Sequence, residues 1–209
     1  FEIVNRSSGD VTYAGVRVPV GGVVTVIRPS AADGAATTGN NALQYGTYGI
    51  REVATSDGYL MSDTAERTFE IRRDGQMVVI DGADAVRNQV KRGDFELVKI
   101  GEDKAERLGG VPFLVTSKAT GEAHVVVTDA NGQVKTASEW NAHTQKTNAN
   151  DAAVDANGDG VFSEEEKGSV DVSKLDCYAG LWFGLHPETG EGTNPNDALG
   201  ALPWGDYTI

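Results

Sequence analysis

The stretch Asn88-Gln89-Val90-Lys91-Arg92-Gly93-Asp94-Phe95-Glu96-Leu97-Val98-Lys99-Ile100 decides how this chain is organised. At the left end of this stretch, residues 85–90 have the composition of the end of a strand. At its right end, Phe95–Leu97 alternates apolar and charged residues, and Val98–Ile100 continues that strand pattern. Lys91–Asp94 reads as a polar bend, and no helix signal is present. We therefore expect two β units joined end to end by a very short link.

The composition narrows the class of protein. The chain has 209 residues and a net charge of −13, which argues against nucleic acid and anionic membranes as partners. No apolar run approaches the length of a membrane span, so we expect no membrane insertion. Cys177 is the single cysteine, which excludes an internal disulfide. Because the chain begins with Phe1 and ends within a strand pattern, we expect a piece of a longer protein.

The first unit, residues 1–92, shows strand signals and no helix. Residues 1–5 read as a strand, and residues 11–27 read as two or three short strands. Thr68–Arg73 and Gln76–Ile80 flank Asp74-Gly75, which predicts a hairpin. These patterns predict an all-β sandwich.

The second unit, residues 93–209, starts the pattern again. Phe113–Thr116 matches the opening strand of the first unit, and Ala123–Thr128 is a further strand. An irregular acidic insertion then covers about 138–176, and strand character resumes at Ala179–Gly184. We therefore expect a second sandwich with an insertion.

The end of the chain echoes the first unit. Asn41–Ile50 aligns with Gly200–Ile209, so that Ala-Leu, aromatic-Gly and Tyr-x-Ile recur at the same spacing. An internal repeat of this kind indicates a tandem array.

These motifs support a resemblance to a known family. The pattern Leu-x-aromatic-Gly-x-Tyr-x-Ile-x-Glu, followed by Asp57-Gly58-Tyr59, resembles the Cna-B type, or SpaA-like, repeats of Gram-positive surface proteins and pilins. Residues 92–100, with 108–113, resemble the start of the next repeat. The resemblance implies two tandem Ig-like or prealbumin-like β-sandwiches, the first lacking its N-terminal strand and the second truncated at its C-terminus.

The resemblance also implies a covalent cross-link. Many members of the family carry a spontaneous isopeptide bond between a lysine and an asparagine, assisted by a glutamate or aspartate. Burial lowers the pKa of a lysine and raises that of a glutamate, which suits nucleophile and acid respectively. Contact between the reactants removes the entropy cost of their meeting.

Three residues fall at the family's positions for this chemistry. Glu52 takes the glutamate position and Asn88 the asparagine position of the first unit, and Lys99 takes the lysine position of the second. Each is a polar residue on an apolar strand face. Neither unit has a complete triad in these 209 residues, so we expect no closed bond within them. The alternative is that all three are ordinary exposed, turn or edge residues.

The insertion contains an EF-hand-like loop. Oxygen-bearing side chains occupy loop positions 1, 3 and 5, a glycine follows at 6, and a glutamate ends the loop at 12. Phe162 at position 8 is an apolar residue that could anchor the loop. The pattern predicts calcium ligands at Asp155, Asn157, Asp159, Val161 (through its carbonyl), Ser163 and Glu166. The alternative is an acidic, Asn/Gly-rich loop that matches by coincidence.

The remaining motifs carry less weight. Arg92-Gly93-Asp94 spells an integrin-type tripeptide, which we interpret as a linker coincidence. The three histidines, His124, His143 and His186, have no cysteine or carboxylate partners at metal-site spacing, so we expect structural or surface roles. No phosphate loop, nucleophile elbow or zinc signature is present. We therefore do not expect an enzyme.

Together these features predict a structural stalk or adhesin module of an extracellular, cell-wall-attached bacterial protein, with a calcium-stabilised insertion. Its partners would be neighbouring repeats of the same protein. The alternative is an adhesin domain that contacts a host protein or glycan through residues 138–198. A non-catalytic module of a secreted carbohydrate-active enzyme is a third, weaker interpretation.

Overall fold

The protein folds into two compact all-β units, Phe1–Gln89 and Val90–Ile209. The structure is a computed structural model that describes residues 1–30, 35–39, 42–102 and 106–209. The prediction of an all-β protein is confirmed, since only short helical segments interrupt the strands. Within the described residues, no helix is both long and apolar enough to span a membrane.

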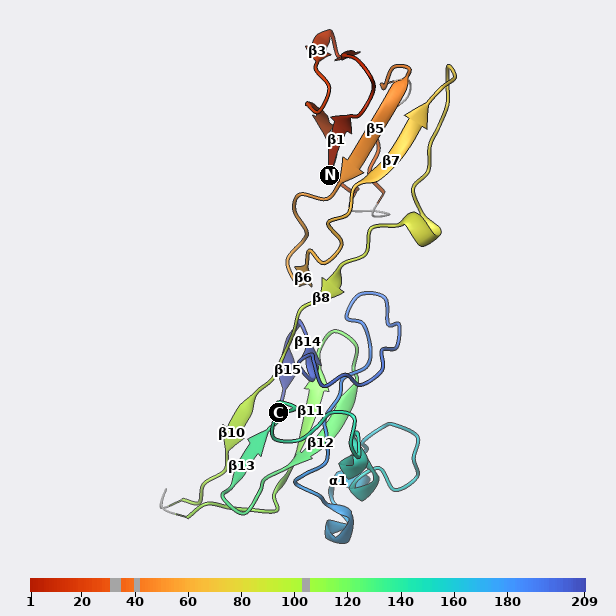
Figure 1. Cartoon of the computed structure of the whole chain (residues 1–209). Coiled ribbons are helices and arrows are strands. Elements are labelled where there is room, and N and C mark those ends of the chain that lie inside the picture. The colour runs from red at the N-terminus through yellow and green to blue at the C-terminus, as the bar shows by residue number, and fades with distance from the viewer. Residues whose placement is uncertain (31–34, 40–41, 103–105) are drawn as a thin grey trace. The chain divides into compact units, whose positions relative to one another are not determined.

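The first unit is built on a four-stranded antiparallel sheet with the strand order β4-β1-β5-β7 (Figure 1). A hairpin of β2 and β3 and a short β6–β8 pair complete it. Ala14 and Gly15 connect β2 to β3 with positive φ angles of 46° and 80°, as a two-residue hairpin turn requires. The elements are β1 (Glu2–Asn5), β2 (Val11–Tyr13), β3 (Val16–Val18), β4 (Val23–Val26), β5 (Gly46–Arg51), β6 (Tyr59–Leu60), β7 (Arg67–Ile71), the 3₁₀ helix η1 (Gly82–Asp84) and β8 (Gln89–Val90).

The core of the first unit forms between the main sheet and the β2–β3 hairpin. Ile3, Val11, Val18, Val24 and Tyr48 are buried there. Six partly buried side chains pack against them: Tyr13, Ile27, Leu43, Ile50, Phe69 and Ile71. The alternation of apolar and polar residues along β7 therefore places one face of that strand in the core.

Two sequence expectations for the first unit need correction. Asp74-Gly75 forms the predicted turn, but 76–80 belongs to no strand of the described part, and Met77 is 83% exposed. The predicted strand at 85–90 is limited to Gln89–Val90, because η1 and an irregular segment precede it. An apolar run alone does not secure a partner strand, and tertiary pairing decides.

The second unit has a three-stranded sheet of order β12-β11-β15 and two-stranded pairs β10–β13 and β14–β9. Lys91–Asp94 is not a free bend, because Arg92–Gly93 pairs as β9 with β14. The elements are β9 (Arg92–Gly93), β10 (Glu96–Val98), β11 (Pro112–Ser117), β12 (Ala123–Val127), β13 (Gln133–Lys135), η2 (Ala149–Ala153), α1 (Glu164–Lys167), η3 (Val172–Lys174), β14 (Leu202–Pro203) and β15 (Tyr207–Thr208).

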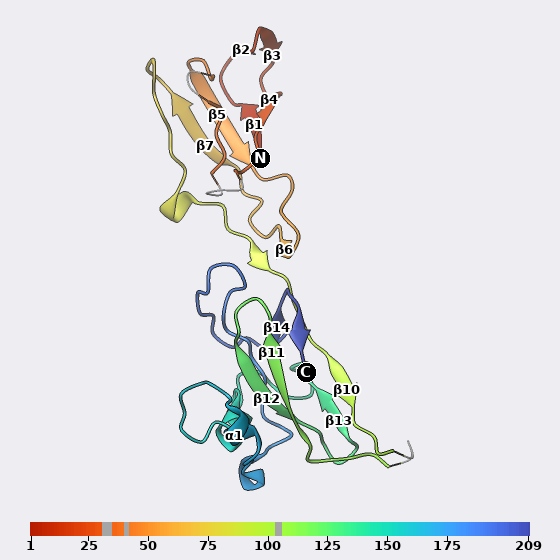
Figure 2. The same ribbon diagram turned by 180° about the vertical axis from the view of Figure 1, so that it is seen from behind.

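The insertion packs against the outer face of β12. Val126 points into the main core of the second unit, whereas Val125 and Val127 contact Val154 and Phe162 of the insertion. Both views show α1 and the turns around it beside β12 (Figures 1 and 2). Val125–Val127 of β12 are all apolar because this part of the strand is buried on both faces. The predicted strand at Ala179–Gly184 is not one, although Leu181, Trp182 and Phe183 are buried.

The two units repeat one strand register. In the first, Val4 pairs with Gly49 and Asn5 with Tyr48. In the second, Thr116 pairs with Thr208 and Ser117 with Tyr207. The sequence echo places Tyr48 and Tyr207, and likewise Gly49 and Thr208, at equivalent positions. Asn41, the first residue of the echo, lies outside the described residues. β5 and β15 are therefore the same strand of two successive copies.

Candidate functional site

Two of the three isopeptide candidates are in direct contact in the first unit. Glu52, which directly follows β5, is only 8% exposed, and Asn88 precedes β8. Asn88 Nδ2 donates hydrogen bonds to Glu52 Oε1 at 2.7 Å and Oε2 at 2.8 Å, and contacts Thr55 Oγ1 at 3.0 Å. Residues 36 positions apart are thus brought together at one point.

The carbonyl end of the same amide has its own partner. Ser62 donates its backbone N–H to Asn88 Oδ1 at 3.2 Å, and its hydroxyl accepts from the Gln89 N–H at 3.0 Å. Glu52 lies on the amide nitrogen, whereas the oxygen accepts from Ser62. Glu52 is therefore placed beside the group that would leave in an amide exchange. Ser62 lies beside the oxygen on which negative charge would develop.

Lys99 lies in the second unit, so it is not part of the Glu52–Asn88 contact. It follows β10 and is half-buried, on the same side of the strand as Phe95 and Leu97. Its N–H donates to the Gly132 carbonyl at 2.7 Å, and its own carbonyl accepts from the Leu108 N–H at 3.1 Å. Phe95 and Leu97 pack on the main core, so Lys99 extends that core-facing row.

The EF-hand-like loop has a compact conformation in the insertion. Gly158 and Gly160 take positive φ angles of 74° and 78°, which lets the chain turn around Asp155. Asp155 accepts from the N–H of Gly158 through Oδ1 and from that of Gly160 through Oδ2, at 2.7 and 2.8 Å. Phe162 packs beneath the loop against the β12 face, as an anchor at this position should.

The end of the loop is fixed by a capping box. Ser163 caps α1, and Glu166 accepts from both the N–H and the hydroxyl of Ser163. The Ser163 hydroxyl and N–H and the Asn157 N–H lower the pKa of Glu166, while burial and the nearby charge of Asp155 oppose the shift. The first and last predicted ligands thus lie close enough to interact electrostatically.

The loop is not a ready-made metal cage. In the described part of the chain, no three Asp, Glu, His or Cys side chains converge as a metal site. The carboxylates of Asp155, Asp159 and Glu166 accept hydrogen bonds from their own loop. The donor set, with hard oxygens at the expected positions, suits calcium. Binding would require these carboxylates to rotate toward a common centre.

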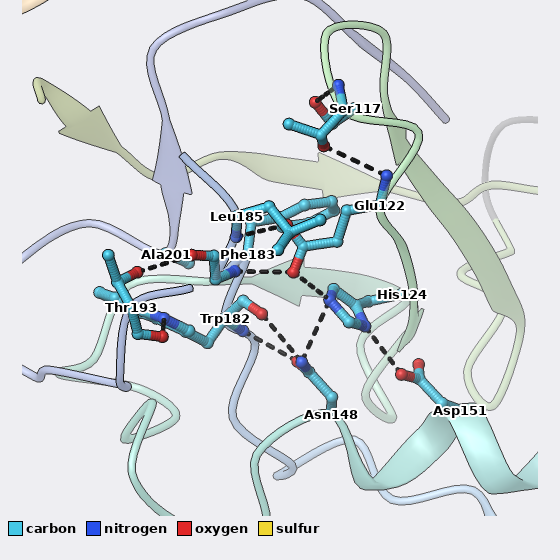
Figure 3. A network of polar contacts seen from close by, with 12 residues as sticks. Ser117, Glu122, His124, Asn148, Asp151, Trp182, Phe183, Leu185, Thr193 and Ala201 are labelled. Atoms are coloured by element: carbon cyan, nitrogen blue, oxygen red, sulfur yellow. Dashed lines mark hydrogen bonds and ion pairs between the residues drawn. The ribbon is translucent and has the colours of Figure 1, made fainter. Parts of the chain in front are cut away.

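A buried polar network around His124 was not anticipated. Its Nδ1 lies 2.7 Å from Asp151 Oδ2 and its Nε2 lies 3.0 Å from Glu122 Oε1, with Asn148 Nδ2 3.2 Å from Nε2 (Figure 3). His124 thus has two carboxylate partners, although no metal-type cluster is present in the part of the chain that the structure describes. Desolvation lowers the pKa of His124, but hydrogen bonds and charges from Asp151 and Glu122 outweigh it and raise the pKa to about 9.

The network fastens the insertion to the sheet. Glu122 accepts from the N–H groups of Gly184 and Leu185 at 2.7 and 2.9 Å, and Asp151 accepts from that of Val125 at 2.8 Å. Glu122 directly precedes β12 and lies two residues before His124, so alternation along an extended chain could have placed them on one face. Nothing in the sequence near Asp151, which lies in η2, indicates that it would join them.

The side chains of Arg92 and Asp94 in the Arg92-Gly93-Asp94 tripeptide bind other residues of the second unit. Arg92 donates to the carbonyls of Gly200, Phe183 and Ala201 at 2.7, 2.6 and 2.7 Å. Its guanidinium carbon lies 3.7 Å from the centre of the Trp182 ring, and burial lowers its pKa to about 10. Asp94 accepts from the Thr136 hydroxyl at 3.0 Å. Neither charged side chain is presented as a cell-binding loop would present it.

Comparison with known proteins identifies the first unit. Residues 7–84 match the family model of the SpaA prealbumin-like fold domain, which confirms the resemblance to Cna-B or SpaA-like repeats for that segment. The match indicates a structural module of a surface or pilin protein and an extracellular location. No curated protein and no solved structure matches the chain.

Proposed function

We propose that this chain is a structural stalk or adhesin module of a bacterial cell-surface protein, of the isopeptide type in its parent, with an insertion ordered by calcium. The observation that carries the proposal is the contact between Glu52 and the Asn88 amide. The two residues are 36 positions apart in the sequence, and polar groups withdrawn from solvent are held where each satisfies the other.

The bond-forming step follows from this geometry. The neutral amine of a lysine would attack Cγ of Asn88, the new C–N bond would form, and the bond to Nδ2 would break. Glu52 lies on Nδ2, so its carboxylate would take the proton that the attacking amine loses and pass it to Nδ2, which then leaves as ammonia. The Ser62 N–H would stabilise the tetrahedral oxyanion. The proposal assigns the lysine to a neighbouring strand of the parent, because the described hydrogen-bond partners of Glu52 and Asn88 include none.

Intact-mass measurement tests this step. A version of the protein extended before Phe1 by one strand, roughly six residues containing a lysine, should lose one ammonia on folding. Peptide mapping should join that lysine to Asn88. The variants Asn88→Ala and Glu52→Ala should retain the full mass. An extended wild-type protein with unchanged mass would remove the isopeptide assignment.

The calcium assignment rests on the ligand types and on the order already present in the loop. Calcium supplies a hard cation that neutralises the clustered carboxylates of Asp155, Asp159 and Glu166. Asn157, Ser163 and the carbonyl of Val161 complete the proposed ligand set. Because Phe162 joins the loop to the β12 face, cation binding would stabilise the second unit as a whole.

A second candidate, an adhesin that binds a host protein or glycan through the insertion region, is favoured by two exposed aromatic side chains. Trp140 is 57% exposed and Tyr178 is 72% exposed. The Lys135 amine lies 3.6 Å from the centre of the Trp140 ring and already occupies one face of it. Oligosaccharide titration that quenches Trp140 emission, and fails with Trp140→Ala, would favour this function over a purely structural one.

A further inference from the structure

The second unit binds the chain directly after the residue at which the unit begins. It starts at Val90, and β9 pairs antiparallel with β14 two residues later. Between them, the Lys91 carbonyl accepts from the Trp204 N–H at 2.7 Å. The start of the unit is therefore fastened to a segment that lies far away in the sequence.

Arg92 adds side-chain bonds at the same place. Its guanidinium donates to the carbonyls of Gly200, Phe183 and Ala201 at 2.7, 2.6 and 2.7 Å. It also lies 3.7 Å from the centre of the Trp182 ring. Hydrogen bonds from a charged donor are stronger than neutral ones, and the planar guanidinium can serve several acceptors while it stacks. One side chain therefore holds two separate segments against β9.

The backbones of the two paired segments are in direct contact at Gly93 and Gly200. A Cβ added to Gly200 would lie 2.5 Å from the Gly93 nitrogen and 2.6 Å from its Cα. One residue later, Asp94 accepts from the Ala201 N–H at 3.1 Å and from the Thr136 hydroxyl at 3.0 Å. No side chain fits between the two segments at this point.

Contacts arranged in this way resist a pull along the chain. The hydrogen bonds of an antiparallel pair run perpendicular to the strands. A pull along β9 therefore loads them together, whereas a pull at right angles would break them one after another. Forced unfolding is governed by the unfolding rate, and this rate depends on the interactions that break before the transition state. Interactions at the point where the load enters thus contribute directly to that barrier.

We propose that Lys91–Asp94, with the segment 200–204 to which it is bound, is a mechanical clamp of the second unit. Tension that arrives through Val90 passes from β9 to β14 before it reaches the three-stranded sheet. This inference rests on the proposed stalk role, because a stalk module is held under tension along its chain. The intact-mass test at Asn88 does not involve the clamp residues, so the two proposals can fail separately.

Single-molecule pulling of the 209-residue protein in two geometries tests the clamp. In the first, the protein is held at its N-terminus and at Ala119→Cys, in the exposed turn between β11 and β12, so the load enters through Val90. In the second, it is held at Ala119→Cys and at Ile209, so the load bypasses Val90. Every protein carries Cys177→Ala, which makes the attachment point unique.

Loss of a clamp contact should matter in the first geometry. Arg92→Lys should raise the unfolding rate of the second unit at a fixed force at least about tenfold there, as expected when one charged hydrogen bond is lost from the barrier. In the second geometry the rate should change far less. Asp94→Ala removes the acceptor of the Ala201 N–H, should show the same contrast, and replaces Arg92→Lys if that variant does not fold. The control Arg107→Lys should leave both rates unchanged.

The comparison of geometries separates a clamp from a merely stabilising contact. The proposal is overturned if Arg92→Lys and Asp94→Ala accelerate unfolding equally in both geometries, because they would then weaken the unit as a whole. It is also overturned if neither variant changes the rate when the load enters through Val90. Unfolding of the first unit, a separate event in the first geometry, should keep its rate in every variant.

Discussion

Tyr48 and Tyr207 make the same hydrogen bond in two successive copies of one fold. The Tyr48 hydroxyl donates to the Gln44 carbonyl at 2.9 Å, and the Tyr207 hydroxyl donates to the Pro203 carbonyl at 2.7 Å. Each tyrosine thereby closes the loop that leads into its own strand, β5 or β15. Burial raises the pKa of Tyr207 to about 12 although the Arg92 charge opposes the shift, so the phenol remains a donor at neutral pH.

Removal of either hydroxyl should destabilise only its own unit. Tyr48→Phe and Tyr207→Phe should each cost about 1 kcal/mol, the usual net value of a hydrogen bond. All three tryptophans, Trp140, Trp182 and Trp204, lie in the second unit. Tryptophan emission during urea unfolding should therefore shift for Tyr207→Phe and remain unchanged for Tyr48→Phe. Equal shifts for both variants would contradict independent closure of the two loops.

A conservative substitution at Arg92 should lower the stability of the second unit by more than the partial exposure of this residue suggests. Lysine cannot reach three carbonyls at once or stack flat on Trp182, so Arg92→Lys should cost the second unit about 2–3 kcal/mol. The matched control is Arg107→Lys, because Arg107 is exposed and the side-chain contact it makes within the described residues is a long one, to the Asn131 carbonyl at 3.5 Å. An Arg92 variant as stable as the control would show that the buried guanidinium contributes little.

The fold was largely predictable because it depends on local alternation and on a repeat. Strand signals at 1–5, 113–116 and 123–128 led to β1, β11 and β12, and the echo located the shared register of β5 and β15. The failures have a common cause. Residues 76–80 and 179–184 are apolar enough for strands but pair with no strand of the described part of the chain, and the choice of a partner strand is a tertiary property.

The candidate site was predictable only where a family motif marked it. The resemblance indicated Glu52 and Asn88, but not Thr55 or Ser62, whose roles depend on how loops converge. The His124 network was missed because Asp151 lies 27 residues from His124 in an irregular insertion. Buried polar groups of this kind satisfy one another across long sequence separations, and no local pattern records them.

Loss of the Asn88 amide should weaken the first unit even without a cross-link. Asn88→Ala leaves the Glu52 carboxyl buried without its two donors, which should cost about 1–3 kcal/mol. Hydrogen exchange of residues 46–62 should accelerate, while tryptophan emission from the second unit should not change. Arg87→Ala, at the exposed neighbouring position, serves as the control. Unchanged exchange in Asn88→Ala would remove the energetic basis of the Glu52 contact.

Calcium should stabilise the second unit and chelation should reverse the effect. At 100 times the dissociation constant, a cation that binds only the folded state adds about 2.7 kcal/mol. Glu166→Gln should abolish binding heat and stabilisation because it removes the bidentate ligand at the end of the loop. Glu165→Gln removes the same charge one position earlier and should retain both. A wild-type protein with no binding heat and an unmoved unfolding midpoint would exclude calcium as the loop's ligand.

Stability of the second unit should fall as pH rises because of His124. Its pKa is raised from 6.5 to about 9 by the Asp151 and Glu122 partners despite desolvation, so the folded state binds the proton more tightly than the unfolded state. The stabilisation is fully present below pH 6.5 and is lost as pH rises through 9. The shift corresponds to a contribution on the order of 3 kcal/mol at low pH.

The charged groups facing the ring are Glu122, directly before β12, and Asp151 on η2, while Asn148 and Phe183 contribute neutral contacts. Urea midpoints from tryptophan emission should decline between pH 6 and pH 9.5 in the wild type and much less in His124→Gln. His186→Gln, outside the network, should keep the wild-type slope. If the urea midpoint of His124→Gln falls with pH as in the wild type, other groups cause the pH dependence, and the network contributes packing only.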